Sequence, residues 1–182
     1  LSCNGCSPNE YKLKKRIEKA KDLFLCFTGI EKLESTDFGE ILEKRNGVAE
    51  IFINGIKVAE EENFLFSYNI TSINRILRKA LNRERTNVGR TAYSERIKAI
   101  LLSAQSDKVL EMLTDNLEEM SSGRQFDELK WLEVQKHAVK HLNAREDTVF
   151  VTPDEIKNSS GAILDIVRSS GKTPVFITET VR

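Results

Sequence analysis

Positive charge is concentrated in one segment of a chain whose charges otherwise balance. Residues 75–98 contain eight Lys or Arg and two Glu, a local charge of +6, whereas the whole chain has 28 basic and 28 acidic residues. Most of these cations are arginines, and arginine binds phosphate oxygens through two parallel hydrogen bonds that lysine cannot make. The segment therefore predicts contact with phosphate or another anion. A solvated helix face and internal salt bridges are the alternatives.

The segment divides into a helical part and a break. Residues 75–83 have helical spacing, and their cations recur on one side, where they could hold the backbone of nucleic acid. The nucleic-acid candidates are Arg75, Arg78, Lys79 and Arg83. Asn87 and Gly89 then break the helix, and free backbone amides at the start of the next helix can help to bind an anion. The candidates for this anion site are Arg83, Arg85, Arg90 and Thr91.

Signatures of enzymes and metal sites are weak. The sequence has no GxxxxGK[ST] phosphate loop, GxGxxG, GxSxG or HExxH. His137 and His141 have the i, i+4 spacing of metal ligands on a helix, but nothing supplies a third ligand. Cys3 and Cys6 form a CxxC, which is half of a zinc site, a redox pair or an uninvolved terminal stretch. No metal site is therefore predicted, and a small enzyme with its site near Thr152 is a further alternative.

The elements that would position these residues begin with a helix and a β-rich stretch. Apolar residues at helical spacing predict a helix from residue 9 to about residue 25, after Pro8. Asn54-Gly55 is a strong hairpin signal, because both residues accept positive φ. The β-rich runs predict one antiparallel sheet with a single buried face. The predicted strands lie within residues 31–36, 39–44, 48–53, 56–60 and 64–70.

Helices dominate the second half of the chain until the pattern changes. The tail, residues 148–178, reads as strand, helix and strand, which predicts a parallel β-α-β unit. The predicted fold class is α+β: an antiparallel sheet with helices on one face, followed by helices and a small β-α-β unit. Helices are predicted from Thr71 or Ser72 and over residues 91–103, 107–120 and 126–142. The predicted divisions are an N-terminal segment and helix (1–22), an α+β domain (23–104) and a helical and β-α-β domain (105–182). A boundary near residue 124 is the alternative to the one at 104.

Composition and targeting signals restrict the setting. No apolar run reaches the ~18 residues that a membrane-spanning helix needs, and the N-terminus has no signal-peptide pattern. Three cysteines in 182 residues are too few for a disulfide scaffold, so a cytoplasmic protein with no membrane partner is predicted. The chain begins with Leu, which leads us to expect a fragment of a longer protein.

The running sequence also resembles a group of ATP-binding proteins. The resemblance lies in Ile51 to Leu102, which begins "IFINGIKVAEEENFLFSYNI" and ends "RTAYSERIKAILL", and in the later segments "WLEVQKHAVKHLN" and "TVFVTPDE". These resemble the region that follows the nucleotide-binding domain in prokaryotic members of the gyrase, Hsp-ninety, histidine-kinase and MutL (GHKL) superfamily. The similarity covers most of the chain from about Leu23 and includes no diagnostic catalytic motif.

The resemblance implies an architecture and a function. In that superfamily a transducer domain follows the ATP-binding domain and lends one basic residue to the γ-phosphate, for which Arg85 and Arg90 are the candidates. The nucleotide-binding loops are not recognisable here. This chain is therefore expected to hold no cofactor and to have no ATPase activity alone, while the full-length protein would bind ATP and magnesium.

These observations predict two alternative functions. In the first, residues 23–104 are a transducer-like domain that couples nucleotide state to a partner or to dimerisation. Its partners would be an upstream ATP-binding domain of the same protein and a second copy in a homodimer. In the alternative, the chain is an independent nucleic-acid-binding module that uses residues 75–98.

Overall fold

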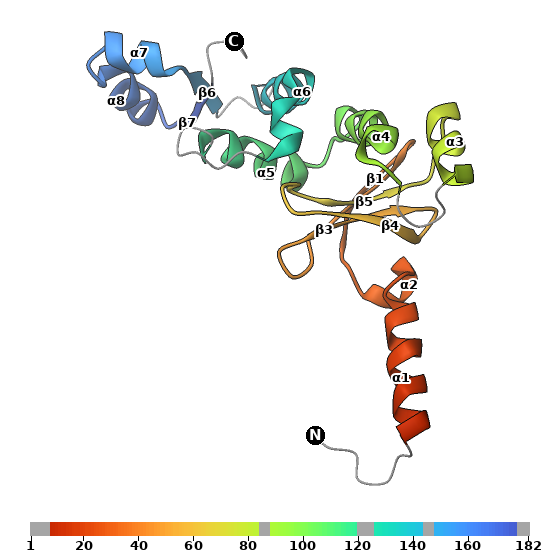
Figure 1. The fold of residues 1–182 in the computed structure, drawn as a ribbon. Coiled ribbons are helices and arrows are strands. Elements are labelled where there is room, and N and C mark those ends of the chain that lie inside the picture. The colour runs from red at the N-terminus through yellow and green to blue at the C-terminus, as the bar shows by residue number, and fades with distance from the viewer. Residues whose placement is uncertain (1–7, 84–87, 120–125, 144–147, 178–182) are drawn as a thin grey trace.

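The computed structural model describes residues 8–83, 88–119, 126–143 and 148–177. A five-stranded sheet has helices on one face, and a smaller unit with two strands follows at the C-terminal end (Figure 1). The N-terminal helix extends away from the other side of the sheet (Figure 1). The predicted α+β class is confirmed. None of the helices within these described ranges is both long enough and apolar enough to cross a bilayer.

The large sheet has the strand order β1-β2-β5-β3-β4. The pairs β1–β2, β2–β5 and β3–β4 are antiparallel, whereas β3 and β5 are parallel. The prediction of an antiparallel sheet therefore needs correction at one pairing. After the β3–β4 hairpin the chain returns past β3 and inserts β5 between β2 and β3. The strands are β1 (Lys32–Thr36), β2 (Gly39–Leu42), β3 (Ala49–Ile53), β4 (Ile56–Glu61) and β5 (Ser67–Ile70).

The β3–β4 hairpin turns at Asn54 and Gly55, as predicted. Both residues have positive φ, 48° and 78°, which Asn and Gly tolerate better than other residues do. Ile53 pairs with Ile56 directly across the turn. The local sequence therefore sets the register of this hairpin.

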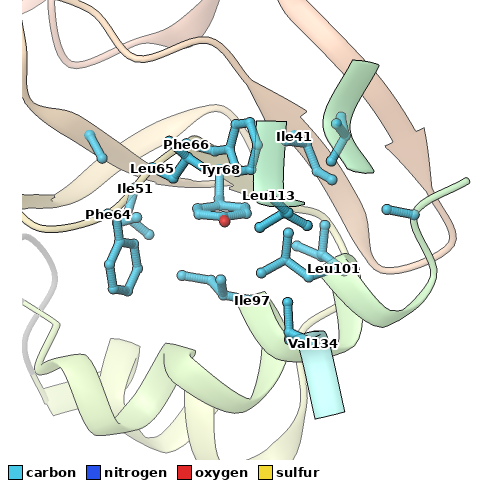
Figure 2. Close-up of a cluster of buried hydrophobic side chains, with 14 of the residues drawn as sticks. Ile41, Ile51, Phe64, Leu65, Phe66, Tyr68, Ile97, Leu101, Leu113 and Val134 are labelled. Carbon is cyan, nitrogen blue, oxygen red and sulfur yellow. The ribbon is translucent and has the colours of Figure 1, made fainter. Parts of the chain in front are cut away.

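Helices α4 and α5 pack against the sheet, α4 on β2 and β5 and α5 on β1. Figure 2 shows Ile51 and Tyr68 from the strands facing Ile97 of α4, with Leu113 of α5 and Val134 of α6 in the same apolar cluster. Side chains before and after residue 104 thus share one core, and the predicted domain boundary there stays a prediction. The helices are α3 (Arg75–Arg83), α4 (Arg90–Leu102), α5 (Asp107–Glu119) and α6 (Leu132–Asn143), with a 3-10 turn η2 (Asp127–Lys130) before α6.

Helix α3 and the helix predicted over 126–142 differ from the prediction. α3 begins at Arg75, because the Asn74 side chain caps it by accepting a hydrogen bond from the Leu77 N–H (2.8 Å). The helix predicted over 126–142 is divided into η2 and α6, since Trp131 has an extended backbone (φ −84°, ψ 105°) between them.

The N-terminal helix α1 (Pro8–Lys21) ends earlier than predicted. The chain beyond it is held by edge strand β4 and the turn before it: the Lys57 N–H donates to Leu23 O, and the Leu25 N–H donates to Gly55 O, both at 2.8 Å. A single helical turn, α2 (Leu25–Thr28), follows. These two bonds attach the end of α1 to the sheet.

The C-terminal unit has the predicted β-α-β order. Strands β6 (Thr148–Val151) and β7 (Thr173–Phe176) pair in parallel, and two short helices connect them. Thr152 caps the first helix, as its sequence suggests, in a capping box with Glu155. The helices are α7 (Pro153–Asn158) and α8 (Ala162–Ser169).

Candidate functional site

Helix α3 presents the nucleic-acid candidates predicted from the sequence. Its Leu77 is fully buried, and Ala80 and Leu81 are half-buried, so this side attaches the helix to the core. At 100° per residue, the four cations fall on the opposite side, within an arc of about 140°. All four are exposed: Arg75, Arg78, Lys79 and Arg83.

The cations of α3 are not neutralised by any residue that the structure describes. The helix itself, RILRKALNR, contains no acidic residue. Within the described residues, none of the salt bridges involves an α3 cation, although the chain has many acidic side chains to offer. Acids three or four residues away on a helix can pair with such cations, and α3 offers none. The α3 face is therefore a patch of net positive charge that is open to a ligand.

Arg90, at the start of α4, has a different environment. Its Nη2 donates to Asp127 Oδ2 at 2.6 Å, its Nη1 lies 3.7 Å from Glu61 Oε2, and its guanidinium lies 4.6 Å from the Phe64 ring centroid. Lys130 also reaches Asp127, at 2.6 Å. Two cations thus meet two carboxylates, and the group has no net charge.

The pKa values of this group follow from its geometry. Burial lowers the pKa of Arg90. The hydrogen bond from Arg90 to Asp127 and the charge of Glu61 together raise the pKa by more than burial lowers it, so the net shift is upward. Burial raises the pKa of Asp127, while Lys130 and Arg90 lower it and prevail. Arg90 and Asp127 are therefore both charged near neutral pH.

A buried carboxylate lies next to this group. Glu128, in η2, is fully buried and accepts hydrogen bonds from the Leu65 N–H (2.8 Å), the Phe66 N–H (3.3 Å) and the Tyr68 hydroxyl (2.9 Å). Burial raises the pKa of Glu128 to about 7, although these hydrogen bonds act in the opposite direction. Its contacts show a structural role, because it satisfies the backbone amides that lead into β5.

Three of the four residues of the predicted anion site lie within the described residues, and the site stays a prediction. Arg90 faces carboxylates, so a phosphate would have to compete with Asp127 and Glu61 for it. Thr91 and Arg83 are exposed, and Arg85 lies outside the described residues. The rest of the basic segment is engaged as well: Lys98 pairs with Glu133 (2.7 Å), and Arg96 lies over the Phe38 ring (5.5 Å). Of the described part of the segment, α3 alone offers unpaired cations as a group.

The residues considered for metal binding or catalysis have structural roles where they are described. His137 Nε2 lies 2.7 Å from Ala104 O, and Thr152 uses its hydroxyl in the capping box. No set of three His, Cys, Asp or Glu within the described residues could hold a metal ion. Cys3 and Cys6 lie outside the described residues, and Cys26 is exposed and unpaired.

A cavity of about 230 Å³ lies elsewhere, between α2 and the end of β2. Its one amine, Lys44 Nζ, donates to the backbone oxygens of Glu62 (2.8 Å) and Phe64 (3.0 Å). The amine is thereby committed to holding the loop before β5. Its lining is Gly29, Ile30, Glu31, Glu43, Lys44 and Arg45.

Comparison with known proteins identifies related sequences. Residues 15–107 match the family model described as the Mycoplasma pneumoniae MPN635 N-terminal domain. An uncharacterized protein of Mycoplasma pneumoniae (strain ATCC 29342 / M129 / Subtype 1) is 48% identical over 88 residues, which cover 48% of this chain and 35% of the relative. A second uncharacterized protein of that strain is 34% identical over 122 residues, 66% of this chain and 34% of the relative. The chain spans about a third of the length of these relatives. No solved structure matches it.

These comparisons correct the resemblance to the GHKL superfamily, which is wrong. The matching family covers residues 15–107 and so includes 51–102, the longest of the stretches on which the resemblance was based. The transducer-like domain, the upstream ATP-binding domain and the binding of ATP and magnesium were inferred from that resemblance alone. The features of α3 do not depend on it.

Proposed function

This chain belongs to the family described as the Mycoplasma pneumoniae MPN635 N-terminal domain, and we propose that α3, which lies within the matched residues, binds the phosphate backbone of nucleic acid. One observation carries the proposal. Three arginines and a lysine share the exposed side of α3, with no acid on the helix and no salt bridge to a described residue. Arginine favours phosphate, because its planar donors match two phosphate oxygens at once.

The size of the patch suits a polyanion with closely spaced charges. From Arg75 to Arg83 the helix rises about 12 Å, and duplex DNA carries about seven phosphate charges over that length. Four cations on such a helix can each meet a phosphate. Phosphate contacts carry no sequence information, so the binding is expected to be independent of base sequence. A cytoplasmic location, where nucleic acid is accessible, is part of this proposal.

The proposal is tested with two variants that lose the same number of positive charges, one on α3 and one on α1. In the test variant, Arg75, Arg78 and Lys79 are each replaced by Gln, which is a good helix former. In the control variant, Lys12, Lys15 and Lys19 on α1 are each replaced by Gln; all three are exposed. Both variants lose three positive charges. Filter binding of duplex DNA and of single-stranded RNA is measured over a range of salt concentrations.

The two variants are expected to differ in the salt dependence of binding. Each phosphate contact contributes about −0.9 to the slope of log K against log salt in duplex DNA, so the α3 variant should lose about 3 in slope. The α1 variant should keep the slope of the wild-type chain. An equal loss in both variants would show that net charge, and not α3, governs binding. No binding by the wild-type chain at low salt would also refute the proposal.

A further inference from the structure

Helix α1 has an apolar stripe that no other described part of the chain covers. Every residue from Asn9 to Lys21 is exposed, including Leu13 (57% exposed) and Ile17 (48% exposed). Phe24 and Phe27, just beyond the helix, are 42% and 63% exposed. Figure 1 shows α1 extending from the sheet, with the short α2 at its C-terminal end and no other helix alongside it. A helix of 14 residues is marginally stable in water alone, and helices usually gain stability by packing an amphipathic face.

The spacing of the stripe is that of a helix that pairs with another helix. Leu13, Ile17 and Ala20 are separated by four and then three residues, which are the d, a and d positions of a heptad. Such a stripe is narrow, so it fits the seam between two helices better than a membrane surface, which needs a wider apolar face. The hydrogen bonds of Leu23 and Leu25 to β4 fix the end of α1, so the stripe is presented in one orientation.

The charges beside the stripe indicate what kind of helix pairs with it. α1 contains six Lys or Arg and two Glu, a local charge of +4. In this heptad register, Arg16 occupies a g position and Lys21 an e position, which flank the seam. A second copy of α1 in the parallel arrangement would place cations opposite cations, which disfavours self-pairing. A helix with acidic flanking positions would instead form salt bridges across the seam.

We propose that α1 is a docking helix for an acidic amphipathic helix of another protein. The apolar positions of that helix cover Leu13 and Ile17, and its acids pair with Arg16 and Lys21. This inference concerns a surface separate from α3, and it does not rest on nucleic-acid binding. It identifies the partner by its pattern: apolar residues at a and d and Asp or Glu at e and g.

The test uses a synthetic peptide of three heptads with Leu at a and d and Glu at e and g. A matched peptide carries Lys in place of Glu. Fluorescence anisotropy is expected to show that the protein binds the acidic peptide and not the basic one. Arg16→Glu with Lys21→Glu should reverse this preference, and Leu13→Gln with Ile17→Gln should abolish binding. These side chains are exposed, so the variants should fold, and far-UV circular dichroism with urea unfolding checks this.

Any one of four results would overturn the proposal. The first is that the acidic peptide does not bind, and the second is that it binds the Leu13→Gln, Ile17→Gln variant as tightly as the wild type. The third is that the protein alone sediments as a dimer and that the same two substitutions dissociate it, because a second copy would then be the occupant of the stripe. The fourth is that the protein binds anionic phospholipid vesicles through Leu13 and Ile17 and does not bind the peptide, because a membrane surface would then be the occupant.

Discussion

Glu128 is a single residue that connects two distant parts of the chain. Its carboxyl group lies in η2, yet it accepts hydrogen bonds from the backbone of Leu65 and Phe66 and from the Tyr68 hydroxyl. Burial also raises the pKa of Tyr68, as does the charge of Glu128. A buried acid of this kind makes folding stability depend on pH.

Glu128 should lower the stability of the fold as the pH rises through the acidic range. Its pKa is about 7 in the folded chain against an ordinary value of 4.5. Its stabilising contribution is therefore complete below pH 4.5 and is lost as the pH rises to about 7. The side chain of Glu128→Gln is neutral at every pH. From about pH 5 to about pH 8, the free energy of unfolding of the wild type should therefore decrease by on the order of 3 kcal/mol more than that of Glu128→Gln.

Urea denaturation at the two pH values measures this difference. Glu133→Gln is the matched control, because Lys98 lowers the pKa of Glu133 and its contribution changes only at lower pH. Identical pH dependence in the wild type and Glu128→Gln would contradict the prediction.

The contact between Arg90 and Asp127 should be energetically coupled. The Asp127 side chain is 7% exposed, while the Arg90 side chain is 41% exposed, so solvent screens the pair in part. A double-mutant cycle with Arg90→Gln and Asp127→Asn is expected to give a coupling free energy of roughly 0.5–2 kcal/mol in urea unfolding. The cycle for the exposed pair Lys98–Glu133 should give a smaller value. Additive effects for Arg90 and Asp127 would show that this contact contributes nothing to stability.

At the scale of elements, Gly39 allows strand β2 to lie close to both β5 and α4. A Cβ at this position would collide with the Asn69 backbone oxygen and would lie 2.8 Å from Ile100 Cδ1. Gly39→Ala should therefore destabilise the fold by about 1–3 kcal/mol, through overpacking. Gly89→Ala is the control: Gly89 has φ −61° and open space around its Cα, so the change should cost less than about 1 kcal/mol.

Thermal denaturation followed by circular dichroism compares the two glycine variants. A Gly39→Ala variant as stable as the Gly89→Ala variant would mean that β2 can move away from α4 without loss.

The elements that the sequence predicted well have local causes. The Asn54-Gly55 hairpin and the helix start at Thr152 each depend on residues within a few positions of one another. Boundaries were less accurate, because Asn74 took the capping role expected of Thr71 or Ser72. The exposed cations of α3 were also predictable, since helical spacing alone places them on one side.

At the scale of the whole molecule, long-range contacts decide what the sequence could not show. Arg90 is a plausible anion ligand by its position at a helix start, but its partner Asp127 is far along the chain. Glu128 has no local signal that separates it from a surface acid. The GHKL resemblance was wrong as well; it contained no diagnostic motif, and function must be argued from a site.

The place of β5 in the sheet has a consequence for the order of assembly. Chain synthesis completes the β1–β2 and β3–β4 hairpins first, and until β5 emerges the facing edges of β2 and β3 have no strand between them. Unpaired edges are the parts of a nascent chain most prone to wrong pairing. After β5 has emerged, the amides of Leu65 and Phe66 still lack their hydrogen-bond acceptor, because Glu128 is synthesised some sixty residues later. The sheet is thus completed by residues made well after its last strand.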